Sequence, residues 1–134
     1  MNIVKLYLLT ALVFFALDFV WLSRVAQGFY QNYLGHLLRP EPLILAAVVF
    51  YALYIAGIIV FAVLPGIEAG DLSKTVMLGA FLGLFAYATF DLTCRALFID
   101  FPIVVVVVDL IWGSVLTAAV SAAGFGIGRW LGMS

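Results

Sequence analysis

The sequence has very little charge and only one cysteine. Charged residues make up 10% of its 134 residues, whereas they make up about a quarter of a soluble domain. Its six Lys and Arg nearly balance seven Asp and Glu and form no basic run, which argues against binding to nucleic acid. The lone Cys94 excludes an intramolecular disulfide and any paired-cysteine zinc motif. Nucleophilic triads and dinucleotide fingerprints have no counterpart either, so no cofactor is expected.

What the chain has instead is apolar surface. Apolar residues make up 67% of it, and its mean hydropathy is +1.28. A small domain leaves much of its surface exposed and cannot hide this many apolar side chains from water. We therefore expect an all-α integral membrane protein, because helices satisfy their own backbone polar groups in lipid.

Four segments are long and apolar enough to cross a bilayer, which takes about 20 residues per helix. Pro42 and Pro102 mark the starts of the second and fourth segments. Pro65, which is followed by glycine, predicts the end of the second, and Asp71 or Ser73 can cap the third. No linker or second domain is apparent. We expect one transmembrane domain over residues 1–134, a four-helix bundle with spans at about 4–26, 43–64, 75–98 and 103–126.

The segment between the first two spans, residues 27–41, is too polar to cross the bilayer. Its large apolar side chains recur at the spacing of one helical face. We predict a short amphipathic helix that lies at the membrane interface and ends at Pro40, with an ordered loop carrying aromatic anchors as the alternative. The apolar face consists of Tyr30, Tyr33, Leu34, Leu37 and Leu38.

Small residues follow helical faces in the third and fourth spans. Gly79 and Gly83 are four residues apart, as are Gly113, Thr117 and Ser121. Small side chains let transmembrane helices approach each other closely. The two faces therefore predict helix packing inside the bundle or, alternatively, a seam between the copies of a homo-oligomer.

Three aspartates lie inside the predicted spans, where an unpaired charge costs on the order of several kcal/mol. Asp91 and Asp109 lie nine residues on either side of Asp100, so an antiparallel hairpin brings them to one depth. Asp18 lies eight residues before the expected end of the first span and is predicted at the same depth. We expect these carboxyls to form a cluster that binds a ligand, carries protons or supplies an acid and a base. A structural polar clasp is the alternative.

Further polar and aromatic side chains belong to the same half of the membrane. Arg95 follows Asp91 by four residues and Tyr87 precedes it by four, so both can reach Asp91 along one helical face. An Asp91–Arg95 ion pair is therefore predicted, and Tyr87 can hydrogen-bond within the cluster. Trp21 and Trp112 each follow an aspartate by three residues. The expected ligand-binding residues, around a cavity that opens toward the loops, are Trp21, His36, Tyr87, Arg95 and Trp112.

Metal binding is not predicted. The three aspartates and His36 offer oxygen and nitrogen atoms that a hard cation such as Mg²⁺ or Mn²⁺ accepts as ligands. However, no DxxD, ExxH or HxxxH pair lies on one helix, and a lone interfacial His is more often solvated.

Three aspartate motifs follow one another along the chain. They are ALDFVWL at residues 16–22, TFDLT at 89–93 and VDLIWG at 108–113. With these motifs the chain resembles, over most of its length, the small bacterial membrane proteins that share the domain of unknown function 2177. The resemblance implies the membrane fold and the bacterial inner membrane, but no reaction. It highlights Asp18, Trp21, Asp91, Asp109 and Trp112.

Three functions fit these features. The first is a membrane site that binds, or acts on, a lipid or another hydrophobic small molecule. The second is proton- or cation-coupled transport by a small oligomer. The third is an accessory subunit whose polar side docks a partner. Whether the protein is an enzyme is left open.

With four spans, both termini lie on one side of the membrane. The Lys and Arg residues divide evenly between the two sides and do not set the orientation. The short, weakly charged N-terminal flank favours cytoplasmic termini.

Overall fold

Four long helices build the molecule. The computed structural model describes residues 2–38 and 43–133, which form helices joined by short turns, without a strand. Four described stretches are long and apolar enough to cross a membrane: Asn2–Val25, Ile44–Ala69, Leu72–Leu97 and Ile103–Trp130. The predicted all-α, four-span architecture is confirmed, and the spans differ from the expected ones only at their ends.

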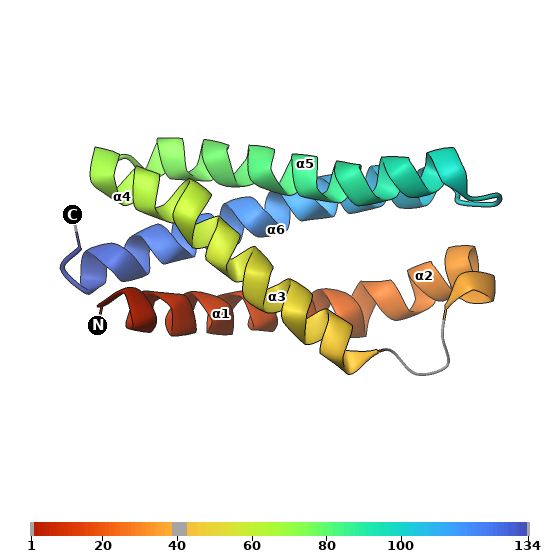
Figure 1. Cartoon of the computed structure of the whole chain (residues 1–134), viewed down its shortest axis with the longest axis horizontal. Helices are drawn as coiled ribbons and strands as arrows, with labels where there is room; N and C mark the ends of the chain where they lie inside the picture. Colours follow the sequence, from red (N-terminus) through yellow and green to blue (C-terminus); the bar gives the residue numbers. More distant parts are fainter. Residues whose placement is uncertain (1, 39–42, 134) are drawn as a thin grey trace.

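The helices follow one another as an up-and-down bundle. The elements are α1 Asn2–Trp21, a π-helical turn Leu22–Ala26, α2 Gln27–Leu34, a 3₁₀ turn Gly35–Leu37, α3 Ile44–Ile58, a second π-helical turn Ile59–Val63, α4 Leu64–Ala69, α5 Leu72–Leu97 and α6 Ile103–Trp130. Figure 1 shows α1, α5 and α6 running along the long axis, with α3 crossing them obliquely. Both termini lie at one end, and α2 and the α5–α6 turn lie at the other.

α5 and α6 pack closely along their small residues. A Cβ atom added to Gly83 would lie 2.1 Å from the carbonyl oxygen of Gly113, and one added to Gly79 would lie 2.4 Å from Ser121 Oγ. Residues without a side chain permit this approach. Of the two interpretations that the sequence leaves open, the structure therefore uses these faces, including Thr117, for packing inside one chain.

The second span continues through Pro65 instead of ending there. Proline lacks a backbone N–H and crowds the preceding helical turn, which is why the sequence predicts an end at this point. The π-helical turn Ile59–Val63 lies just before Pro65, and its wider winding accommodates the ring. The helix ends instead at Gly70, whose φ of 63° provides a left-handed C-cap. The predicted stop at Pro65 is therefore wrong.

The starts of the last two spans agree with their sequence signals. Asp71 caps α5 by accepting hydrogen bonds from the backbone N–H groups of Ser73 and Lys74, at 2.9 and 3.3 Å. Pro102 directly precedes α6. Pro42, the expected start of the second span, lies outside the described residues.

A short helix follows the first span, as predicted, in the form of α2 and the 3₁₀ turn after it. α2 continues from α1 through the π-helical turn rather than after a break. Tyr30 and Leu34 are half-buried against a core cluster near the α5–α6 turn, whereas Tyr33 and Leu37 are exposed. Pro40, the expected end of this helix, lies outside the described residues.

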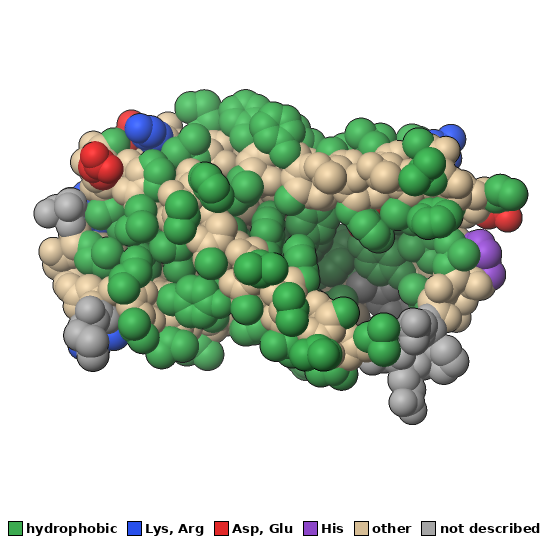
Figure 2. All heavy atoms as spheres, in the orientation of Figure 1, with side chains coloured by type: hydrophobic (Ala, Val, Ile, Leu, Met, Phe, Trp, Pro, Cys, Tyr) green, Lys and Arg blue, Asp and Glu red, His purple; other side chains and the backbone are tan. Residues whose placement is uncertain are grey.

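Two core clusters hold the bundle together. The larger one joins α1, α3 and α6 around Phe14, Ile58 and Val120. The smaller one lies at the α5–α6 turn and contains Cys94, Phe101, Val105 and Val106. Figure 2 shows apolar side chains over the middle of the visible face and charged ones at its two ends. This distribution is typical of a molecule surrounded by lipid.

Candidate functional site

Each of the three aspartates is buried in the bundle. Asp18 on α1, Asp91 on α5 and Asp109 on α6 are 8%, 1% and 7% exposed. A polar group that has left water needs a hydrogen-bond partner, and an ionised one needs it most. The partners of these carboxyls therefore define what the site can do.

Asp91 and Asp109 lie at one level of the α5–α6 hairpin. Gly79 lies against Ser121, and the same register places Asp91 beside Asp109. The two aspartates also line one cavity. They share this depth because α5 and α6 are antiparallel and Asp100 lies in the turn between them.

Asp18 lies deeper along the bundle. Trp21 of α1 stacks on Trp112 of α6, and these helices run in opposite directions. Each aspartate precedes its tryptophan by three residues, so Asp18 and Asp109 lie on opposite sides of the stack along the bundle axis. At 1.5 Å per residue, the two aspartates are offset by about 9 Å along this axis. The prediction of one depth for all three carboxyls is wrong for Asp18. The reason is that α1 runs on into α2, so residue 26 does not mark the end of the helix.

Two of the carboxyls have tyrosine partners. The Tyr51 hydroxyl of α3 donates to Asp18 Oδ2 at 2.8 Å, and the Tyr30 hydroxyl of α2 donates to Asp109 Oδ1. Burial raises the pKa of Tyr30, and the hydrogen bond to Asp109 raises it further, so this hydroxyl keeps the proton that it donates. Sequence reasoning missed both partners. The sequence indicates only that a buried carboxyl needs a hydrogen-bond donor, and not which residue provides it.

Asp91 has no such partner. Both of its oxygens are buried, and neither accepts a hydrogen bond from a donor group among the residues that the structure describes; its polar neighbour is the Asp109 carboxyl. The predicted Asp91–Arg95 ion pair is wrong, because the Arg95 guanidinium donates to the Phe101 carbonyl oxygen at 2.8 Å. Arg95 lies one turn closer to the helix end, where its exposed side chain reaches the α5–α6 turn.

The aromatic site residues pack between helices. Trp21 and Trp112 stack with ring centroids 4.4 Å apart and planes at 8°. Tyr87 packs against Gly113, where an added Cβ would lie 2.3 Å from Tyr87 Cγ. Within the described part of the chain, no hydrogen bond joins Tyr87 to the aspartates. Tyr87 instead contributes its ring to a cavity wall beside Asp91.

A cavity in the side of the bundle reaches Asp91 and Asp109. Its inner part, about 400 Å³, lies between α3 and α5, and its outer part, about 550 Å³, lies between α2 and the α5–α6 turn. Phe90 and Asp109 line both parts, so the two parts adjoin. We call them together the lateral cavity. Figure 2 shows the hollow beside α3, below α5. The walls are Tyr30, Leu34, Leu37, Leu38, Phe50, Ala86, Tyr87, Phe90, Asp91, Cys94, Phe98, Phe101 and Asp109.

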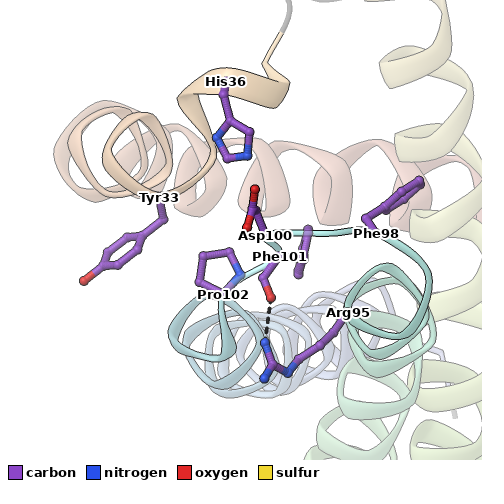
Figure 3. Close-up of a pocket in the computed structure, with 7 residues that line it drawn as sticks. All are labelled: Tyr33, His36, Arg95, Phe98, Asp100, Phe101 and Pro102. Carbon is purple, nitrogen blue, oxygen red and sulfur yellow. Dashed lines mark hydrogen bonds between the residues drawn. The ribbon is translucent and has the colours of Figure 1, made fainter.

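His36 and Arg95 line a different pocket. It is open, measures about 490 Å³ and lies between the end of α2 and the α5–α6 turn (Figure 3). This tip pocket is completed by Tyr33, Phe98, Asp100, Phe101 and Pro102. The expected site therefore divides in two. The described residues contain no group of three His, Cys, Asp or Glu side chains arranged to hold one metal ion.

The lateral cavity suits an apolar molecule with one polar group. Most of its walls are aromatic and aliphatic, and its polar lining residues are Tyr30, Asp91 and Asp109. A carboxyl group accepts hydrogen bonds when ionised and can donate one when protonated. Two carboxyls beside one cavity can also supply a general acid and a general base.

Comparison with known proteins agrees with this fold and adds no activity. No curated protein and no solved structure matches the chain. A family model described as "Predicted membrane protein (DUF2177)" matches residues 3–126, which include the three aspartate motifs. The resemblance seen in those motifs is confirmed, and the chain belongs to this family of membrane proteins, whose function is unknown.

Proposed function

We propose that the protein binds a lipid or another hydrophobic small molecule in the lateral cavity, with Asp91 and Asp109 as its polar contacts. The carboxyl of Asp91 carries this proposal. It is 1% exposed, lines the cavity, and has no hydrogen-bond partner among the described residues. An unsatisfied buried polar group costs about 1–3 kcal/mol. A ligand with a hydrogen-bonding group would remove that cost.

The walls of the cavity support a ligand that arrives from the membrane. Leu37, Phe90 and Phe98 line the cavity and are also exposed on the outside of the chain. A molecule dissolved in the surrounding hydrocarbon can therefore enter sideways without crossing water. Its apolar part would lie against these side chains, and its polar group would meet Asp91 and Asp109.

The two carboxyls also have the different surroundings that acid–base chemistry requires. Asp109 accepts a hydrogen bond from Tyr30, whereas Asp91 has no described partner. Binding is still the function that the geometry supports best, because it needs only the contacts given above. A reaction would need, in addition, a substrate bond placed between the two groups.

Photocrosslinking tests the proposal. The purified protein is placed in vesicles of phosphatidylethanolamine and phosphatidylglycerol that contain a trace of phospholipid with a diazirine on one acyl chain. After illumination, mass spectrometry of the peptides locates the adducts. We expect them on cavity-lining residues such as Phe90, Cys94 and Phe98. Cys94→Phe should strongly reduce them, because the larger side chain fills the cavity.

Ala119→Phe is the matched control. Ala119 is exposed on α6 and does not line the lateral cavity, so this variant adds a ring of the same size away from it. It should leave the adduct pattern unchanged. Adducts spread evenly over the outward faces of the four spans, with no loss in Cys94→Phe, would contradict binding in the cavity.

Proton- or cation-coupled transport and a partner-docking role rank below binding. A transport path would have to continue through the half of the bundle nearer the termini, whose core includes Leu6, Val63 and Ile67. A docking role makes no use of the unpartnered Asp91. Proton flux into vesicles that disappears in Asp91→Asn would favour transport over our proposal.

We also propose that the chain resides in the bacterial inner membrane with both termini in the cytoplasm. The resemblance to small bacterial membrane proteins and the weakly charged N-terminal flank support this location. Alkaline phosphatase is active only after export from the cytoplasm, so a fusion at the C-terminus should be inactive. An active fusion would reverse the proposed orientation.

A further inference from the structure

We propose that the bound molecule is a zwitterionic phospholipid with a primary amine, and that its headgroup occupies the tip pocket. This inference rests on the proposed function, because the apolar part of the lipid would lie in the lateral cavity. The inference is based on two opposite charges in this pocket. Arg95 and Asp100, both among the described residues, line one pocket, and Arg95 donates to a backbone carbonyl instead of to Asp100.

The tip pocket adjoins the lateral cavity. Phe98 and Phe101 line both of them, and both residues belong to the turn between α5 and α6. The third span ends at Leu97, so this turn lies at the level of lipid headgroups. A phospholipid can therefore place its headgroup in the tip pocket while its chains extend along the lateral cavity.

Arg95 forms the phosphate-binding side. The hydrogen bond from Arg95 to the Phe101 carbonyl oxygen, 2.8 Å, holds the guanidinium at the pocket wall. A guanidinium has five N–H donors, so others are available for phosphate oxygens. Figure 3 shows the His36 ring reaching into the pocket from the opposite side, next to α2. A phosphodiester would therefore bind to Arg95, with His36 lining the same pocket.

Asp100 forms the amine-binding side. Figure 3 shows its carboxylate pointing toward the His36 ring, near the middle of the pocket. Its backbone is left-handed, with φ of 64°, a conformation that residues other than glycine adopt at a cost. Aspartate is one of the few residues other than glycine that adopt this conformation in turns. An aspartate provides a carboxylate, to which a primary ammonium group can donate.

The charges of the pocket also discriminate between headgroups. The headgroup of phosphatidylglycerol has the same phosphate but no ammonium group to meet Asp100, so nothing on this lipid offsets the repulsion between its phosphate and that carboxylate. The choline headgroup has a positive charge but no N–H to donate. A primary amine beside a phosphodiester satisfies Arg95 and Asp100 together, so the ethanolamine headgroup fits best.

Three photoactivatable lipids that differ only in headgroup test this inference. Phosphatidylethanolamine, phosphatidylcholine and phosphatidylglycerol with the same diazirine chain are each added in trace to phosphatidylcholine vesicles containing the full chain. Mass spectrometry then measures the adducts in the lateral cavity. We expect the ethanolamine probe to give about fivefold more cavity adducts than either of the others, the effect of one exposed ion pair.

Variants separate the two halves of the headgroup. Asp100→Asn removes the charge but keeps a residue that tolerates the left-handed backbone, and it should abolish the preference for ethanolamine over choline. Arg95→Gln should reduce labelling by all three phospholipids but not by a diazirine diacylglycerol, which has no phosphate. Arg129→Gln, near the other end of the molecule, is the matched control and should keep the wild-type pattern.

The outcomes distinguish this inference from the proposed function. Equal cavity labelling by the three headgroups would overturn the inference and leave lipid binding intact. No cavity labelling by any probe would overturn both. Strong competition by water-soluble glycerophosphoethanolamine would overturn the assignment to a membrane lipid. If Arg95→Gln does not fold, as judged by thermal unfolding, the comparison with Asp100→Asn decides.

Discussion

Asp18 and Asp91 have the same side chain in opposite circumstances. The Tyr51 hydroxyl satisfies Asp18 at 2.8 Å, whereas both oxygens of Asp91 lack a partner among the described residues. Removing a satisfied buried group leaves its partner unsatisfied, but removing an unsatisfied one removes a cost. Replacing the two aspartates should therefore change stability in opposite directions.

For protein stripped of lipid, Asp91→Leu should raise the free energy of unfolding by about 1 kcal/mol, and Asp18→Leu should lower it by about 1–3 kcal/mol. Tyr51→Phe removes the same hydrogen bond as Asp18→Leu and should lower it by about 1 kcal/mol. Unfolding in detergent micelles measures all three. If Asp91→Leu destabilises the fold as much as Asp18→Leu does, Asp91 is part of a structural polar clasp and not a ligand contact.

The sequence identifies the buried ionisable residues better than it identifies their hydrogen-bond partners. The aspartates stand out because ionisable side chains are rare in apolar segments. Their partners Tyr30 and Tyr51 do not, because each contact depends on how α2 and α3 lie across the bundle. The i,i+4 spacing brings Arg95 within reach of Asp91, but it cannot reveal that the long side chain reaches the next turn instead.

At the scale of the helix pair, α5 and α6 depend on glycine at specific positions. An alanine at Gly83 would put its Cβ 2.1 Å from the Gly113 carbonyl oxygen, a backbone atom that cannot rotate away. The two helices would have to separate. At Gly57 in α3, nothing lies within 4 Å of an added Cβ.

Gly83→Ala should therefore lower the free energy of unfolding by about 1–3 kcal/mol. Gly57→Ala, the matched control, should leave it unchanged or raise it by up to about 1 kcal/mol, because alanine favours a helix more than glycine does. Thermal unfolding of the two variants in the same detergent gives the comparison. Equal shifts would mean that the approach of α5 to α6 is not as close as the structure has it.

Helix positions could be predicted from hydropathy, and the starts of α5 and α6 from Asp71 and Pro102, but the ends of the first two spans could not. The sequence predicts a stop at Pro65, yet the helix passes it because a π-helical turn precedes it. The first span has no stop at all before α2, since the π-helical turn Leu22–Ala26 carries the chain onward. Wide turns of this kind have no simple sequence signature, and the error in the depth of Asp18 follows directly from the missed continuation.

For the molecule as a whole, the two ends hold different parts of the chain. Both termini lie at one end, and the tip pocket lies at the other (Figure 1). In a Cys94→Ser background, single cysteines at Asn2 and Met133 should react with a membrane-impermeant maleimide from the same side. A cysteine at Asn32 should react only from the opposite side. Reaction of Asn2 and Met133 positions from different sides would contradict four crossings.

The stacked indoles of Trp21 and Trp112 give the protein an optical probe of its own. Two chromophores 4.4 Å apart exchange excitation, and that exchange weakens steeply as they separate. Trp130, the third indole, is exposed on a distant part of α6 and provides a background that Trp130→Phe removes. The polarised emission of the remaining pair then follows, without any attached dye, whether α1 moves against α6 when the cavity fills.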